Sequence, residues 1–400
     1  PTMPRLTLRF QGYFDSVAVK GIDVILIPLS GEDTLAATSD RNGFVHFDSL
    51  AQGRWSVEAT GAHHEMDYAV IHPDTKEGMA VSVFLKKKVS LLWLVLTVLG
   101  GLGVFLLGMD AMSQGLQTVA GSSLRRLVAA LTSHRLFAVL VGVGVTSIVQ
   151  SSSITTVMVV GFVNSGIMYF REALGVIMGA NIGTTVTAWI LVLAVDKWGL
   201  PILGAAAFVY LFSKREKVRY TALAVMGIGM VFFGLELMKN GLASVNDSPD
   251  FLNAFTLFRA DSYFGVMKVA LLGCILTMII QSSSATMGIV IALASQGVIS
   301  FDTSIALVVG ANVGTTITAQ LASIGANVDA RRCAWFHTSF NLVGTILVIA
   351  FFPLFSRLVF FLLEHMMGVS SIVVDGKQTI SASSSPTGIA LVGTLFNCIM

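Results

Sequence analysis

The chain has 400 residues, of which 54% are hydrophobic and 12% charged, about half the charged share of soluble domains. Its net charge of +2 gives no indication of nucleic-acid binding, and we expect no nucleic-acid partner. Charged residues gather in residues 1–88, and long uncharged runs follow them. This distribution predicts an α-helical polytopic membrane protein, embedded in a lipid bilayer and preceded by a small soluble domain.

Residues 1–88 alternate apolar and polar residues in six short runs, LTLRF, VILIPL, GFVHF, RWSVEA, YAVIH and AVSVFL. Alternation at period two is typical of half-buried strands, and the DRNG, AQG and HPDTKEG segments supply turns between them. We therefore predict a small antiparallel all-β sandwich. The segment TSDRNGFVHFDSLAQGRWSVEATG resembles the carboxypeptidase-regulatory or transthyretin-like β-domain family. His63, His64 and His72 are interpreted as solvated loop residues, not as metal ligands.

The rest of the chain contains an internal repeat. One copy has QSSSITTVMVVGFVNSGIM followed by GVIMGANIGTTVTA, and the other has QSSSATMGIVIALASQGVI followed by ALVVGANVGTTITA. Gln150 and Gln281 lie 131 positions apart (281 − 150), and the segments FLLGMDAMSQGL and FFGLELMKNGL precede them. Self-similarity at a fixed spacing indicates a duplicated structural unit. We predict one transmembrane repeat over 89–218, a second over 219–370, and a loop with a final transmembrane segment over 371–400.

Each QSSS cluster lies within an uncharged run, residues 136–168 in one copy and 269–301 in the other. A single helix over such a run would be about 50 Å long, whereas the hydrocarbon core is ~30 Å thick. We therefore predict a re-entrant hairpin in each copy, broken at the serine run. The GANIGTT and GANVGTT segments predict a second broken helix, because glycine and asparagine interrupt helices. Irregular backbone at membrane depth persists only where it is buried or lines a cavity.

The basic segments at 213–219 and 329–332 predict cytoplasmic loops by the positive-inside rule. This assignment places residues 246–250 and the β-domain outside, and gives each copy three crossings, so that the two copies are inverted. Inverted repeats with a site at the membrane midplane are the plan of secondary transporters. We expect a multi-pass protein of the bacterial inner membrane with an extracytoplasmic β-domain and a removed signal peptide. A homodimer is left open.

The breaks carry hydroxyl and amide groups, which donate and accept hydrogen bonds. Helix N-termini at the breaks favour an oxyanion, and freed carbonyl oxygens favour Na⁺. Neither hairpin contains Lys or Arg, so a bound dianion needs a cation that binds together with it. The missing basic residues therefore predict sodium–anion symport, with Na⁺ as the only metal ion and no other cofactor.

The duplicated QSSS and GAN[IV]GTT motifs, together with HTSFNLVGT, resemble the bacterial sodium-dependent phosphate cotransporter family, related to type II Na⁺/phosphate cotransporters. The resemblance implies sodium-coupled uptake of inorganic phosphate. Phosphate binding is assigned to Ser151, Ser152, Ser153, Thr155, Ser282, Ser283, Ser284 and Thr286. Sodium binding is assigned to Gln150, Asn181, Thr184, Thr185, Gln281, Asn312, Thr315 and Thr316.

The chain departs from that family at three points. The second HTLFN-type motif has Gly393 in place of histidine, and the apolar run from Pro386 reaches Met400 while still short of the ~20 residues that a span needs. We therefore expect the last span to be cut short. The N-terminal β-domain is also not a usual part of the family, and its role is left open.

Four alternative functions need to be weighed. Another oxyanion, such as sulfate or a dicarboxylate, would suit the same polar groups, and protons carried by Asp110 or Glu236 could replace sodium. A receptor or adhesion module would explain the β-domain but not the duplicated clusters. An intramembrane serine hydrolase would need a base beside its nucleophile. Because no membrane-region histidine is paired with a serine motif, we expect no enzyme.

Overall fold

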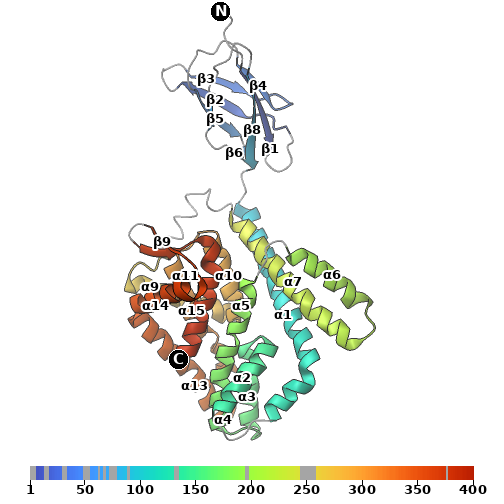
Figure 1. The fold of residues 1–400 in the computed structure, drawn as a ribbon, viewed down its shortest axis with the longest axis vertical. Coiled ribbons are helices and arrows are strands. Elements are labelled where there is room, and N and C mark those ends of the chain that lie inside the picture. Colours follow the sequence, from blue (N-terminus) through green and yellow to red (C-terminus); the bar gives the residue numbers. More distant parts are fainter. Residues whose placement is uncertain are drawn as a thin grey trace, which may run out of the picture. The chain divides into compact units, whose positions relative to one another are not determined.

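The computed structural model describes residues 6–12, 18–28, 34–47, 55–61, 64–65, 69–71, 79–87, 91–129, 135–193, 198–243, 258–374 and 377–400. The chain divides into two compact units, Pro1–Trp93 and Leu94–Met400. The first unit is built of strands and the second of helices (Figure 1). The predicted repeat boundaries at 218 and 370 stay predictions.

The described residues of the first unit form eight strands. They are β1 (Leu6–Gly12), β2 (Asp23–Pro28), β3 (Leu35–Thr38), β4 (Phe44–Phe47), β5 (Trp55–Gly61), β6 (His64–Glu65), β7 (Ala69–Ile71) and β8 (Met79–Lys87). The six predicted strands are all present, and β3 and β6 are additional. The pairing order is β3-β2-β5-β6-β8-β1-β4, with β7 also paired to β5.

One pair of strands differs from the antiparallel prediction, because β1 and β8 run parallel. The other strand pairs of this unit are antiparallel. Parallel neighbours need a long connection between them, and β1 and β8 are the first and last strands of the unit. The strands β2 to β7 belong to that connection. The first and last strands of the unit are therefore hydrogen-bonded neighbours.

The core of the first unit follows the predicted alternation. Leu6, Leu8 and Phe10 of β1 are buried on the same face as residues of β2, β4 and β5, since successive side chains on a strand point to opposite faces. The DRNG turn forms as predicted, with Asp40 Oδ1 accepting hydrogen bonds from the backbone N–H groups of Asn42 and Phe44. The AQG and HPDTKEG segments, and His63 and His72, lie outside the described residues.

The second unit is helical. Its helices are α1 (Leu91–Ala129), α2 (Arg135–Val149), α3 (Ser152–Asn164), α4 (Phe170–Gly183), α5 (Thr185–Val192), α6 (Gly199–Phe212), α7 (Glu216–Ala243), α9 (Tyr263–Ile280), α10 (Ser283–Ser295), α11 (Phe301–Gly314), α12 (Ile317–Ala322), α13 (Val328–Ala350), α14 (Phe352–Met367) and α15 (Ser385–Ile399). A short hairpin of β9 (Ser371–Val374) and β10 (Lys377–Ile380) and a 3₁₀ turn, η2 (Ala382–Ser384), precede α15.

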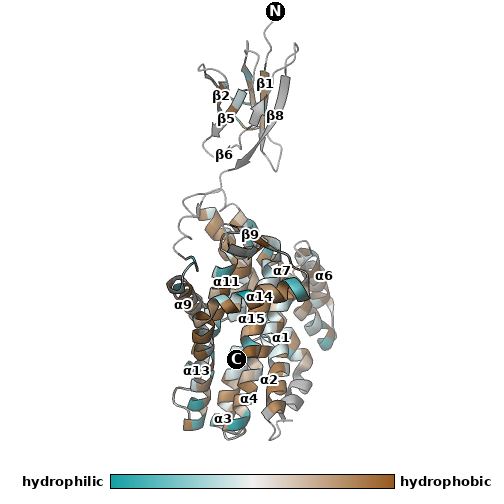
Figure 2. Ribbon diagram, turned by 60° about the vertical axis from the view of Figure 1, so that its left-hand side comes forward, coloured by the Kyte–Doolittle hydropathy of each residue, from teal (hydrophilic) through white to brown (hydrophobic). Residues whose placement is uncertain are grey.

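Six segments among the described residues are long and apolar enough to cross a membrane: Leu92–Gly121, Phe170–Val192, Glu216–Ala243, Tyr263–Ile280, Phe301–Ala322 and Val328–Ala350. Figure 2 shows hydrophobic colour over most of these helices, with hydrophilic colour at helix ends such as that of α13. Their length and composition make this a multi-pass membrane protein.

The helices repeat in pairs at the spacing of the sequence motifs. Helices α2, α3, α4 and α5 correspond to α9, α10, α11 and α12, and α2 packs on α4 as α9 packs on α11 (Figure 1). The close approach depends on glycine, since a Cβ on Gly179 would lie 2.0 Å from Val139 O and one on Gly310 would lie 1.8 Å from Ala270 O. The helix breaks between α2 and α3 and between α9 and α10 lie at the QSSS runs, where the sequence predicts them. The orientation of the two copies in a membrane stays a prediction.

Helices α1 and α7 are joined by what we call the glycine seam. It consists of two sets of glycines at seven-residue intervals, Gly101, Gly108 and Gly115 on α1 and Gly227, Gly234 and Gly241 on α7. A Cβ added to Gly101 would lie 2.9 Å from Gly234 O, and one added to Gly108 would lie 2.8 Å from Gly227 O. Contact between early α1 and late α7 means that the two helices run antiparallel.

Candidate functional site

Both helix breaks are built in the same way. Gln150 and Gln281 adopt a left-handed backbone, each with φ of 58°, which ends the preceding helix and turns the chain. A serine then follows and caps the next helix. Ser151 Oγ accepts from the N–H of Ile154, and its counterpart on α10 accepts in the same manner. The break therefore falls at the start of the serine run, because the first serine serves as the cap.

A threonine pair holds each hairpin together. Thr146 on α2 donates to Thr155 Oγ1 of α3 at 3.0 Å, and the hydroxyls of Thr277 and Thr286 lie 2.8 Å apart in the second copy. Thr155 in turn donates to the carbonyl oxygen of Ser151. Its one hydroxyl hydrogen is thus already used within the hairpin, so in this arrangement Thr155 acts as a structural link.

In the first copy, hydrogen bonds close the break. Gln150 is buried, its Oε1 accepts from Thr187 Oγ1 at 2.8 Å, and its Nε2 donates to the carbonyl oxygen of Ser147. These contacts tie the end of α2 to α5. Both ends of the Gln150 amide are therefore occupied by protein groups.

The asparagine of the first copy is closed in by α13. Asn181 Oδ1 lies 3.2 Å from Nε2 of His337, and Asn181 Nδ2 donates to Asn341 Oδ1 at 3.4 Å. All three side chains are buried. We call His337, Asn181 and Asn341 the α13 cluster. It occupies the amide of Asn181, which the GANIGTT motif would otherwise present to a ligand.

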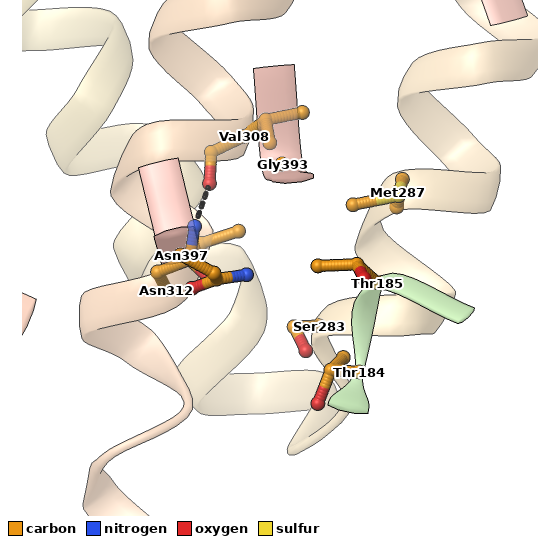
Figure 3. Close-up of a pocket in the computed structure, with 9 residues that line it drawn as sticks. Thr184, Thr185, Ser283, Met287, Val308, Asn312, Gly393 and Asn397 are labelled. Carbon is orange, nitrogen blue, oxygen red and sulfur yellow. Dashed lines mark hydrogen bonds between the residues drawn. The ribbon is translucent and has the colours of Figure 1, made fainter. Parts of the chain in front are cut away.

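The second copy is more open. Gln281 is exposed and Asn312 is only partly buried, whereas their counterparts in the first copy are buried. Beside Asn312 lies a pocket of about 10 Å³, lined by Thr184, Thr185, Ser283, Met287, Val308, Ala311, Asn312, Gly393 and Asn397. Figure 3 shows Thr184, Thr185 and Ser283 on one side of it and Asn312 and Asn397 on the other. We call this the α15 pocket.

The α15 pocket draws residues from both copies of the repeat. Thr184 and Thr185 come from the GANIGTT segment, and Ser283 and Asn312 come from the second copy. This mixing arises because α10 packs on α5, and α15 packs on α5, α10 and α11. None of the nine described residues that line the pocket is Asp, Glu, Lys, Arg or His. The polar lining therefore consists of neutral hydroxyls and amides.

Four of the predicted site residues thus meet, namely Thr184, Thr185, Ser283 and Asn312. The other twelve do not line the pocket: Gln150, Ser151, Ser152, Ser153, Thr155, Asn181, Gln281, Ser282, Ser284, Thr286, Thr315 and Thr316. Sequence reasoning did not assign Asn397 to the site, and it noted Gly393 only as a departure from the family motif. The signal was present in the GTLFN motif, whose asparagine corresponds to Asn341 of HTSFN.

Two copies of a broken-helix unit, meeting at a pocket without charged side chains, define the class of this protein as a membrane transporter built from repeats. Residues 104–240 and 260–374 match the model of the Na⁺/Pi-cotransporter family. The chain belongs to this family.

Several characterised and uncharacterised relatives are similar to the chain. "Uncharacterized protein YqeW" of Bacillus subtilis is 32% identical over 62% of this chain and 79% of its own length. "Putative inorganic phosphate export protein YjbB" of Escherichia coli K12 is 28% identical over 66% of this chain, which spans 48% of that protein. Human "Sodium-dependent phosphate transport protein 2B" is 38% identical over 25% of this chain and 15% of its own length. The chain therefore spans about half of the E. coli relative.

Among solved structures, the Bacillus anthracis TIE protein is 17% identical and covers 22% of this chain and 17% of its own, with a TM-score of 0.20. A TM-score this low supports no argument about fold or function.

Proposed function

We propose that this protein is a sodium-coupled transporter of inorganic phosphate. The observation that carries the proposal is that the described residues lining the α15 pocket include no charged side chain, together with the absence of Lys and Arg from both hairpins. An anion bound among neutral groups needs a balancing charge, and a co-bound cation supplies it. Membership of the Na⁺/Pi-cotransporter family and the names of the human and E. coli relatives support phosphate and sodium as the pair.

Phosphate is proposed to bind at the serine runs that begin α3 and α10. The first N–H groups of a helix have no partner within that helix, and they carry a partial positive charge. Ser152 and Ser283 occupy these first positions, so their N–H and hydroxyl groups suit an oxyanion. The α15 pocket is too small for phosphate, so the anion would bind beside it and not within it.

The direction of transport follows from the gradients. The family resemblance implies uptake, while the E. coli relative is named for export. A symporter runs either way, because phosphate moves with the summed driving force of both ions. Uptake is proposed for an inwardly directed sodium gradient.

The orientation of the chain in the membrane and its oligomeric state are also part of the proposal. The basic loops support an inner-membrane orientation with the β-domain outside. In a chain without Cys274, Cys333 and Cys398, a cysteine in place of Thr34 should react with an impermeant thiol reagent in intact cells. A cysteine in place of Lys214 should react only after lysis. The reverse labelling would contradict the orientation. A homodimer is also retained as a prediction.

The deciding experiment is uptake of radiolabelled phosphate into proteoliposomes that contain the purified chain. We expect accumulation with an inward Na⁺ gradient and not with an equal K⁺ gradient. Unlabelled phosphate should compete, and sulfate or a dicarboxylate in excess should not. Equal uptake in Na⁺ and K⁺ would contradict sodium coupling. Uptake driven by a proton gradient would instead favour Asp110 and Glu236, neither of which lines the α15 pocket.

A further inference from the structure

We propose that the α15 pocket is a Na⁺ site, that Asn397 of α15 supplies one of its ligands, and that Gly393 keeps it open. This inference rests on the sodium coupling proposed above and adds to it a helix that neither the QSSS nor the GAN[IV]GTT motif includes.

The first argument is an unpartnered atom. Asn397 is 6% exposed, and its Oδ1 is buried without a hydrogen-bond partner. A buried amide oxygen without a partner costs about 1–3 kcal/mol, so such atoms are rare in folded proteins. Asn397 lines the pocket opposite Thr184 and Ser283 (Figure 3). A cation in the pocket would supply the missing partner.

The second argument is the supply of acceptor oxygens. Thr184 Oγ1 donates its hydrogen to the carbonyl oxygen of Ala180, and Asn312 Nδ2 donates to the carbonyl oxygen of Val308. These bonds leave the Thr184 hydroxyl oxygen and Asn312 Oδ1 with lone pairs, alongside Asn397 Oδ1. Oxygen atoms with free lone pairs are the ligands that a hard cation needs.

The third argument concerns size and charge. A volume of about 10 Å³ is near the lower limit for one water molecule, and a bare Na⁺ ion is no larger. Hard cations prefer oxygen ligands, and divalent ions are held mainly by carboxylates. Since no carboxylate is among the described lining residues, the pocket suits a monovalent ion.

The fourth argument comes from the corresponding helix. His337 and Asn341 of α13 are four residues apart, as are Gly393 and Asn397 of α15. On α13 the imidazole of His337 contacts Asn181. On α15 the glycine has no side chain, and a Cβ there would meet only Met287 Cε at 3.2 Å and Val308 Cγ1 at 4.0 Å. The space that the His337 side chain fills beside α13 therefore has no counterpart side chain at Gly393 of α15.

The test measures Na⁺ binding in detergent by the Na⁺-dependent rise of the unfolding temperature, with K⁺ at equal ionic strength as the reference. Ligand binding to the folded state stabilises it by RT ln(1 + c/Kd), where c is the free ligand concentration, so the unfolding temperature begins to rise near Kd and then increases with the logarithm of the ligand concentration. Asn397→Ala should increase the Na⁺ concentration at which this rise begins at least tenfold, as expected for losing one contact with a charged ligand. Gly393→Leu should have an effect of the same size, because its side chain would fill the pocket. Phosphate affinity at saturating Na⁺ should change by less than about threefold for Asn397→Ala.

Two control variants make the same kinds of substitution at positions away from the pocket. Asn240→Ala removes an exposed amide on α7, and Gly204→Leu adds a side chain to α6 where a Cβ meets no atom within 4 Å. Both should respond to Na⁺ like the parent chain. Asn397→Ser and Gly393→Ala are milder variants that keep the test valid if the first pair fails to fold.

The outcomes separate the two proposals. If the parent responds to Na⁺ and the α15 variants respond equally, the sodium site lies elsewhere and this inference is wrong, while sodium coupling stands. If the parent responds equally to Na⁺ and K⁺, sodium coupling itself fails, and the site fails with it.

Discussion

The two helix breaks have nearly the same sequence but different surroundings. Both have a left-handed glutamine, a capping serine and a threonine pair at matching positions. The first break is closed by the hydrogen bond between Gln150 and Thr187 of α5, and Asn181 of the same copy contacts His337 of α13. The second break lies beside the α15 pocket, whose lining includes Ser283. The difference therefore arises from the elements packed around each break, and much less from the duplicated motifs. Two nearly identical frameworks can thus differ in whether a pocket lies at the serine run.

The largest expected effect is one that both copies share. Gly179→Ala and Gly310→Ala would each place a Cβ within 2.0 Å of a backbone oxygen, so the helices must separate. Overpacking of this kind costs about 1–3 kcal/mol and more where backbone must move. We expect both variants to lose most of the monodisperse peak in size-exclusion chromatography. Gly161→Ala, where a Cβ meets nothing within 4 Å, is the control, and a marked difference between the two copies would contradict the matched packing.

The next prediction compares a residue of α13 with the corresponding residue of α15. His337→Ala should destabilise the protein by about 2–4 kcal/mol, because it removes a fully buried side chain and one partner of Asn181. Gly393→Ala should change stability by less than about 1 kcal/mol, since the flexible Met287 side chain can move aside. Thermal unfolding in detergent measures both. His365→Ala, on the exposed part of α14, is the control for loss of an imidazole. Equal destabilisation by His337→Ala and Gly393→Ala would contradict the proposed difference between α13 and α15.

A smaller difference should distinguish the two glutamines. Gln150→Ala breaks two hydrogen bonds in a buried position and should cost about 1–3 kcal/mol. Gln281→Ala affects an exposed side chain and should change stability by less than about 0.5 kcal/mol. Chemical denaturation of the two variants, compared at the same detergent concentration, checks the order. Equal costs would show that the second break is as closed as the first.

The smallest effect concerns the backbone itself. Both glutamines adopt φ of 58°, which costs a residue with a side chain about 1 kcal/mol and glycine very little. Gln281→Gly should therefore leave stability unchanged or raise it by a few tenths of a kcal/mol. Gln150→Gly should still destabilise, because it also loses the bond to Thr187. Unfolding temperatures decide the matter, and destabilisation by Gln281→Gly would mean that this side chain makes contacts of its own.

The sequence predicted the frameworks well because they depend on local chemistry. Apolar runs too long for one span, each with QSSS inside, required a break, and the six strand runs followed period-two alternation. The parallel β1–β8 pair and the burial of the first break were not predictable in this way. Both depend on which elements meet in space, and no local pattern specifies that the imidazole of His337 will reach Asn181. Asn397 was missed for the same reason, since its importance depends on lying opposite Thr184 and Ser283.

The glycine seam has a consequence for the symmetry of the chain. Each glycine of the seam on α7 lies 126 positions after one on α1 (227 − 101), so the two helices are the same element of the two copies. Gly101 approaches Gly234 and Gly108 approaches Gly227, which means that each helix presents the same surface to the other. Such an isologous contact is what a two-fold axis produces between identical subunits. The duplicated chain thus contains, inside one polypeptide, the interface of an antiparallel dimer of half-length chains.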